Sequence, residues 1–211
     1  MTRLLYALSG ADRTRQFSPH VWKTVMSLAH KGLAYETVPV LRDGDLLVRD
    51  SFDIAVYLDE AYPDRPTLFG GQGGRAMARF IENWSQSTLH MAVTRIAILA
   101  IHNLLEPADQ TYFRRSREER LGASLEDIAA AGKAEVEGFA KKLQPLRNML
   151  KVQPFIGGEG PLFPDYIVFG ALQWLRTTAG TKVLEEGDPV ADWFARCLDL
   201  HGGAGHRVTA A

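Results

Sequence analysis

The stretch Phe17-Ser18-Pro19-His20-Val21-Trp22-Lys23-Thr24 places a hydroxyl and a proline where an apolar segment gives way to a helical pattern. Ser18 is a preferred N-cap residue, and Pro19 suits the first helical position, where its missing N–H costs nothing. We therefore predict a helix that begins at Pro19 and ends at Lys31-Gly32. The start of a helix carries free N–H groups and partial positive charge, so an anion is favoured beside Ser18, whose O–H can donate to it.

Strand signals surround this helix. Residues 4–8 form an apolar run before it, and residues 35–41 form another after it. Asp43-Gly44 between apolar runs indicates a hairpin. Asp50 or Ser51 can then cap a helix that ends at Tyr62-Pro63. The first third of the chain is therefore predicted to be mixed α/β.

The composition changes at residues 63–74, which are rich in glycine and proline and are typical of a linker. We place a first domain at residues 1–62 and an all-helical domain at residues 75–211. The glycines of the linker lack a preceding strand and the spacing of a dinucleotide-binding loop. A flexible connection is the better explanation.

Helical signals dominate the second domain. They predict a long helix over residues 75–105, a charged connection or helix face over residues 114–120, and a helix that runs from a capping box at Ser124 toward Leu150. A further apolar helix starts at Pro164-Asp165. A last helix covers residues 193–200.

The overall composition excludes several classes of protein. The chain has 211 residues, of which 46% are hydrophobic, with a formal net charge of -1. This balance argues against a nucleic-acid or membrane-surface binder, and no apolar run could span a bilayer. We expect a cytoplasmic protein. The histidines show no metal-ligand spacing, so we expect no metal. Cys197 cannot form an internal disulfide and is interpreted as a packed, inert thiol in preference to a catalytic one.

Several motifs occur in an order that is informative as a set. They are Phe17-Ser18-Pro19 with Lys23, Val38-Pro39-Val40-Leu41, Asp43-Gly44, Asp50-Ser51-Phe52, and Pro164-Asp165-Tyr166. With these motifs the chain resembles a cytosolic-type glutathione S-transferase, and among these it is most similar to the bacterial β-etherase branch, which cleaves lignin aryl ethers, and to related fungal glutathione transferases. The resemblance covers nearly the whole chain.

This resemblance implies a thioredoxin-like α/β domain that binds glutathione, followed by the all-α domain. Ser18 would donate to the glutathione sulfur and favour its thiolate. Val38 would pair its backbone with the cysteinyl unit, and Pro39 would follow a cis peptide bond. Asp50 and Ser51 would hold the γ-glutamyl end, although the family more often has Glu at the first of these two positions. A simpler alternative is that these serine and aspartate side chains only cap helices.

Secondary candidates concern the pocket for the second substrate. The resemblance suggests Phe17, His20 and Tyr112 for the wall that holds an electrophile. For His20, the alternative is a partly exposed helix residue without a catalytic role. Asp165 occupies a position that stabilises the helical core in the family, and we assign it no chemistry.

One segment departs from the family pattern. Only nine residues separate Gly32 from Arg42, so the expected second and third strands are fused without a loop and helix between them. A crossover connection needs a dozen or more residues, which predicts that both strands cannot keep their usual places. Either the chain has lost an element, or the sequence omits a segment near residues 37–38. We favour omission.

The functional expectation is a glutathione transferase with glutathione as cosubstrate. Its thiolate would attack an apolar, aromatic electrophile and, if the subgroup resemblance holds, would cleave a β-aryl ether. The competing hypothesis is a non-catalytic carrier of glutathione or of hydrophobic ligands, or an interaction protein. The family also implies a homodimer. The residues do not identify the electrophile or its stereochemistry.

Overall fold

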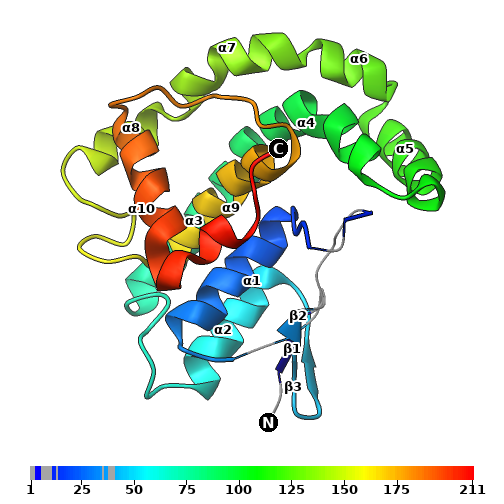
Figure 1. Ribbon diagram of the computed structural model, residues 1–211. Helices are drawn as coiled ribbons and strands as arrows, with labels where there is room; N and C mark the ends of the chain where they lie inside the picture. Colours follow the sequence, from blue (N-terminus) through cyan, green and yellow to red (C-terminus); the bar gives the residue numbers. More distant parts are fainter. Residues whose placement is uncertain (1–2, 6–10, 13, 35, 38–40) are drawn as a thin grey trace.

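The structure is a computed structural model that describes residues 3–5, 11–12, 14–34, 36–37 and 41–211. Four short strands, β1 (Arg3–Leu5), β2 (Glu36–Thr37), β3 (Leu41–Asp43) and β4 (Leu46–Val48), form one sheet in the order β2-β1-β3-β4. β2 runs parallel to β1, whereas β3 is antiparallel to both β1 and β4. α1 (Pro19–His30) and α2 (Ser51–Ala61) pack together beside this sheet (Figure 1). The predicted α/β start of the chain is confirmed.

The prediction that the second and third strands cannot both keep their places is wrong. Leu5 pairs with Thr37 on one side of β1 and with Leu41 on the other. A long crossover is needed between parallel strands, but β2 and β3 run in opposite directions, so the chain only has to pass the end of β1. That step spans about 10 Å, which is two strand spacings, and four extended residues reach about 13 Å. The topology therefore does not require an omitted segment, and the omission near residues 37–38 stays an untested prediction.

The second part of the chain is helical. The helix predicted for residues 75–105 is one run that begins earlier, as α3 (Gln72–Trp84), passes through a π-helical segment η1 (Ser85–His90), and continues as α4 (Met91–Leu104). The remaining helices are α5 (Pro107–Leu121), α6 (Leu125–Ala130), α7 (Gly132–Lys142), α8 (Gln144–Leu150), α9 (Phe163–Thr178), α10 (Pro189–Gly203) and the 3₁₀ helix η2 (Ala204–Arg207). The predicted cap is present, because the Ser124 hydroxyl accepts from the Asp127 N–H at 3.1 Å. Three helices, however, replace the single predicted one.

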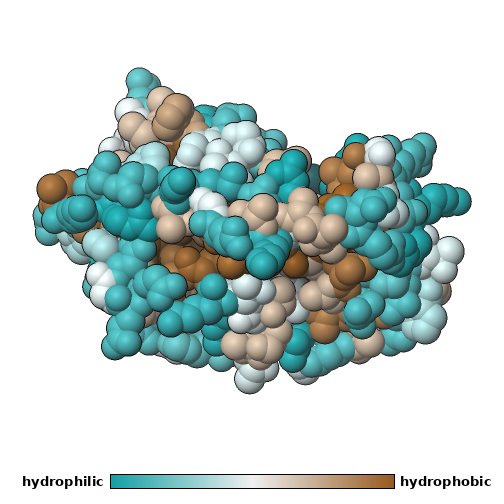
Figure 2. All heavy atoms as spheres, turned by 90° about the horizontal axis from the view of Figure 1, so that it is seen from above, coloured by the Kyte–Doolittle hydropathy of each residue, from teal (hydrophilic) through white to brown (hydrophobic). Residues whose placement is uncertain are grey.

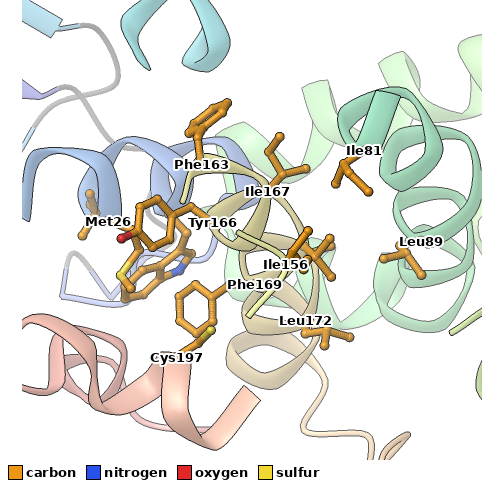
Figure 3. Close-up of a cluster of buried hydrophobic side chains, with 14 of the residues drawn as sticks. Met26, Ile81, Leu89, Ile156, Phe163, Tyr166, Ile167, Phe169, Leu172 and Cys197 are labelled. Atoms are coloured by element: carbon orange, nitrogen blue, oxygen red, sulfur yellow. The ribbon is translucent and has the colours of Figure 1, made fainter. Parts of the chain in front are cut away.

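α9 is the central helix of the molecule. It lies between α1, α3, α4 and α10, and it is buried along nearly its whole length (Figure 3). The Trp22 ring of α1 meets the Phe169 ring of α9 edge-on, with centroids 6.0 Å apart. Cys197 is fully buried against this core, and burial raises the pKa of its thiol. The inert interpretation of Cys197 fits this position.

The start of α9 is held by one buried carboxylate. Asp165 accepts hydrogen bonds from the backbone N–H groups of Ile156, Gly157 and Leu162, at 2.7, 2.9 and 3.0 Å. The indole N–H of Trp193 in α10 donates to the same carboxylate at 2.8 Å. Burial raises the pKa of Asp165, while these four donors favour its charged form. Asp165 thus joins α9, α10 and the preceding turn, in line with its predicted structural role.

A directional hydrogen-bond chain ties the end of α1 to α9 and α10. His30 Nε2 lies 3.0 Å from the Thr67 carbonyl, which can only accept, so this nitrogen carries the proton of the neutral ring. His30 Nδ1 then accepts from the Tyr166 hydroxyl at 2.7 Å. The Tyr166 oxygen is left to accept from His201 Nε2 at 3.0 Å. His30 must therefore be neutral for the chain to form, whereas His201 can donate from Nε2 in either protonation state.

We expect this chain to make the fold sensitive to acid. Burial, followed by the neighbouring His30, lowers the pKa of His201 from 6.5 to about 4. A lowered folded-state pKa gives stability that is complete above pH 6.5 and is lost as the pH falls toward 4. Urea unfolding between pH 7 and pH 4 should show this decline, and His201→Gln, which keeps an N–H donor but cannot titrate, should reduce it. If the free energy of unfolding of the variant fell with pH as steeply as that of the wild type, His201 would not be the source of the acid sensitivity.

The contact between α1 and α9 depends on a glycine. A Cβ atom at Gly170 would lie 2.6 Å from the carbonyl oxygen of Pro19, the first residue of α1. We expect Gly170→Ala to lower the free energy of unfolding by about 1–3 kcal/mol through overpacking. Gly138→Ala on α7 is the matched control, since a Cβ there meets no atom within 4 Å, and it should be neutral or stabilising. Urea denaturation distinguishes the two, and equal stability would refute close packing at Gly170.

The molecular surface seen from above is largely hydrophilic, with a band of hydrophobic side chains across the middle of that face (Figure 2). Within the described ranges, none of the helices combines the length and the apolar character that crossing a bilayer requires.

Candidate active site

A pocket of about 500 Å³ opens at the start of α1. Its walls come from the residues around that helix start, from η1 and α4, from α5, and from α9. The apolar lining residues are Phe17, Pro19, Met91, Ile98, Ile101, Phe113, Leu121 and Trp174, and the polar ones are Ser18, His20, Gln86, His90, Thr94, Arg117 and Arg120. An aromatic and aliphatic cavity with a few converging polar groups is typical of a small-molecule site.

Ser18 stands at the N-cap position of α1 and faces this pocket. Its carbonyl accepts the first helical hydrogen bond from the Trp22 N–H at 3.2 Å. Its side chain, by contrast, makes no capping hydrogen bond, although the residue is only 6% exposed. The side chain of Ser18 thus does not act as a hydrogen-bonding cap here, and its role toward glutathione stays a prediction. Its hydroxyl is available to a ligand at the positive end of the helix.

The start of α2 provides a second polar corner. Asp50 is the cap, and its carboxylate accepts from the N–H groups of Phe52 and Asp53 at 2.8 and 3.3 Å. Asp50 has φ 66° and ψ 130°, which is strained for a residue other than glycine and is often found at ligand sites. Ser51 Oγ is buried without a hydrogen-bond partner among the described residues. A buried hydroxyl of this kind, at a helix start, is suited to an anionic ligand.

A buried ion cluster fixes the two helix starts relative to each other. Lys23 Nζ of α1 lies 2.9 Å from Glu82 Oε1 of α3, with both side chains almost fully buried. Arg79 joins the same glutamate at 3.2 Å, reaches Asp53 of α2 at 3.4 Å, and lies over the Phe52 ring. The cluster connects α1, α2 and α3. The sequence singled out Lys23 but gave no sign of its partners.

Two histidines form part of the pocket wall. The rings of His20 and His90 meet with centroids 5.5 Å apart, and His90 meets Trp174 at 5.7 Å. Desolvation by the surrounding protein lowers the pKa of His20 to about 4 and that of His90 to about 3. His90 Nε2 has no hydrogen-bond partner in the described part of the chain. Both rings are therefore neutral at neutral pH and offer polar contacts without charge.

Comparison with known families identifies the scaffold. The family described as "Glutathione S-transferase, C-terminal domain" matches residues 76–200, which is more than half of the chain. The chain belongs to the glutathione S-transferase family. The curated glutathione S-transferase-like protein ustS of Aspergillus flavus is 29% identical over 136 residues, or 59% of this chain and 49% of that protein. The chain thus spans about half the length of this relative.

Solved structures agree with this assignment. A glutathione transferase of Phanerochaete chrysosporium is 26% identical, with a TM-score of 0.78, and the match covers 98% of this chain and 94% of that one. A glutathione S-transferase of Ceriporiopsis subvermispora, solved in complex with glutathione, is 23% identical with a TM-score of 0.75 over 96% of each chain. The fold is therefore the glutathione S-transferase fold, with an α/β part followed by the helical domain.

Not all of the other predicted site residues lie at the pocket. Phe17 and His20 line the pocket. Tyr112 is 64% exposed and does not line it, while the adjacent Phe113 does. One helical residue is a rotation of about 100°, which is enough to turn Tyr112 away. Val38 and Pro39 lie outside the described residues, so their predicted contacts with glutathione remain untested.

Sequence reasoning missed the two arginines of the pocket. Arg117 and Arg120 follow Phe113 at four and seven positions along α5, the spacing of one helix face. The Arg117 guanidinium lies 4.8 Å from the centre of the Phe113 ring and donates to Ser116 Oγ at 3.0 Å. Burial, and then the charge of Arg120, lowers the pKa of Arg117. The charged run at residues 114–120 was interpreted as a solvated connection or helix face, but two of its seven residues, Arg117 and Arg120, line the cavity.

Proposed function

We propose that this protein binds glutathione and that Ser18 donates a hydrogen bond to its sulfur, favouring the thiolate. The observation that carries the proposal is the Ser18 hydroxyl, which is not used for capping and opens on an apolar pocket at a helix start. A free thiol has a pKa of about 8.5, so most of it would be protonated at neutral pH without such help. A related fold binds glutathione in the Ceriporiopsis subvermispora complex, which supports the proposal.

The γ-glutamyl end of glutathione is proposed to bind at the start of α2. The Ser51 hydroxyl, buried and without a protein partner among the described residues, fits the carboxylate, and the strained Asp50 fits the amino group. In the same proposal, Val38 pairs with the cysteinyl unit and Pro39 follows a cis peptide bond.

The proposed reaction is attack of the thiolate on an aromatic electrophile. In the β-aryl ether form, the sulfur attacks the carbon that bears the aryloxy group beside a carbonyl. The C–S bond forms as the C–O bond breaks, and the departing phenolate takes up a proton. The apolar lining, from Phe17 to Trp174, would hold the two aromatic rings. Positioning and thiolate stabilisation would provide the catalysis.

A calorimetric titration with reduced glutathione, on protein whose length is checked by intact mass, tests this proposal first. Saturable one-to-one binding is expected. A ketone that carries an aryloxy group on the carbon beside its carbonyl should then give a glutathione thioether and a free phenol, both measured by mass spectrometry. Glutathione binding without either product, while chlorodinitrobenzene is conjugated, would leave a transferase and reject the etherase. No glutathione binding would favour the carrier hypothesis.

We also propose that the protein is a cytoplasmic homodimer. Met77, Phe80 and Trp84 follow one another at helical spacing on α3, and Phe80 is 66% exposed. An apolar stripe of this kind suits a contact between two copies of the chain. Analytical ultracentrifugation should give twice the chain mass for the wild type and a monomer for Phe80→Glu. A wild-type monomer would reject the dimer.

A further inference from the structure

We infer that the electrophile taken by this pocket carries a carboxylate, which Arg117 and Arg120 bind. The inference rests on the proposed function and narrows its substrate class from apolar aromatic compounds to aromatic acids. It is carried by the charge of the pocket wall, by the environment of the Arg117 guanidinium, and by the separation of both arginines from the α2 corner proposed for glutathione.

The pocket wall carries positive charge without a counter-charge. Among the described residues that line it, two are arginines and none is aspartate or glutamate. No ion pair joins Arg117 or Arg120 to a carboxylate within the described part of the chain. Arg114, one helical turn before Arg117, is by contrast paired with Glu118 and Glu126, each at 2.9 Å. The charge of Arg114 is therefore balanced by carboxylates, whereas the charges of Arg117 and Arg120 are not.

The histidines of the wall do not alter this balance. His20 and His90 are desolvated and neutral, so they contribute neither a positive charge nor an anion to pair with the arginines. Other polar groups, such as Gln86 and Thr94, are uncharged. The net charge of the described lining at neutral pH is therefore that of the two guanidinium groups.

The environment of the Arg117 guanidinium also favours binding of an anion over solvation by water. It is half-buried, and its guanidinium is held over the Phe113 ring and by Ser116. A partly desolvated cation without a partner is costly, and a bound carboxylate removes that cost. The planar guanidinium fork matches a carboxylate in two parallel hydrogen bonds, and it is ordered before the ligand arrives. The pocket volume of about 500 Å³ accommodates a substituted aromatic acid.

The γ-glutamyl carboxylate of glutathione does not account for these arginines in the proposed arrangement, because it is assigned to Ser51 at the start of α2, and neither Asp50 nor Ser51 lines the pocket. The glycyl carboxylate of glutathione is tested by the titration at saturating glutathione, in which the arginines must stay free for the second substrate. The arginines belong to α5, whose described lining residues otherwise are Phe113 and Leu121. They therefore face the space beyond Ser18, where the second substrate would lie.

The test compares two probes that differ in charge and hardly in shape. Naphthalene-2-carboxylate and naphthalene-2-carboxamide are titrated calorimetrically into the protein, with and without saturating glutathione. We expect the carboxylate to bind at least 10-fold more tightly than the amide. In the double variant Arg117→Gln/Arg120→Gln this preference should fall to less than twofold. Glutathione is titrated into both proteins separately, and circular dichroism checks that the variant is folded.

Arg115→Gln is the matched control, because Arg115 lies on the same helix, is exposed, and does not line the pocket. It removes one positive charge from the same helix and should keep the 10-fold preference. Equal binding of the two probes by the wild type would overturn the inference, as would a preference that survives in the folded double variant. A protein that binds no glutathione but prefers the carboxylate would overturn the proposed function alone.

Discussion

Replacing Ser18 with alanine is expected to lower kcat/KM for glutathione transfer roughly 100-fold. A hydrogen bond to a charged group contributes about 1.5–3 kcal/mol, and each 1.4 kcal/mol corresponds to a factor of ten in rate. The Ser18 side chain makes no capping hydrogen bond to α1, so its removal should act on the bound sulfur more than on the helix. Glutathione affinity should change little, because Ser51 and Asp50 are proposed to hold the peptide.

The pH profile separates a role in thiolate stabilisation from a structural one. In the wild type, the pKa of the bound thiol should lie below that of free glutathione, and Ser18→Ala should raise it. Ser27→Ala is the control, because Ser27 is buried on the same helix, donates to the Lys23 carbonyl at 2.8 Å, and does not line the pocket. It should leave the profile unchanged. A Ser18→Ala enzyme with full turnover would remove Ser18 from the mechanism.

Asp165→Ala should produce the largest loss of stability, about 3–5 kcal/mol in the free energy of unfolding. The substitution leaves three backbone N–H groups and the Trp193 indole N–H without their shared acceptor inside the core. Each buried donor left unsatisfied costs about 1–3 kcal/mol, and partial relaxation keeps the total below the sum. Urea denaturation measures the effect.

The control for Asp165 is Asp192→Ala on α10. Asp192 is also acidic and lies in the first turn of its helix, but it is exposed. Its loss should cost less than about 1 kcal/mol, the usual range for a charge near a helix start. If the two variants were equally stable, the hydrogen bonds of Asp165 would not be what holds α9 in place.

Local signals in the sequence predicted much of the fold. Ser18-Pro19 marked the start of α1, Asp50 the cap of α2, and Ser124 the cap of α6, because each of these depends only on neighbouring residues. The same short range made Ser18 a candidate site residue. A hydroxyl at a helix start is visible in the sequence, and the structure adds that it is not used for capping.

Features that depend on distant contacts were not predictable. The rule for crossover length led to the wrong expectation for β2 and β3, since the sequence does not show strand direction. Tyr112 was predicted at the pocket, where the structure has Phe113, because nothing in the sequence fixes which face of α5 lines the cavity. Arg117 and Arg120 were overlooked for the same reason, as a charged helix run is usually solvated.

The π-helical segment η1 affects how the pocket lining can diverge among relatives. An α-helical residue advances the chain by about 100°, whereas a π-helical turn accommodates one residue more than an α-helical turn. Gln86 and His90, which line the pocket, both lie in this turn. Deleting one residue there would restore a regular helix and keep α3 and α4 in phase on either side. The loss or gain of a single codon at this point would thus change which polar side chains line the pocket together with Ser18, while the surrounding helices keep their arrangement.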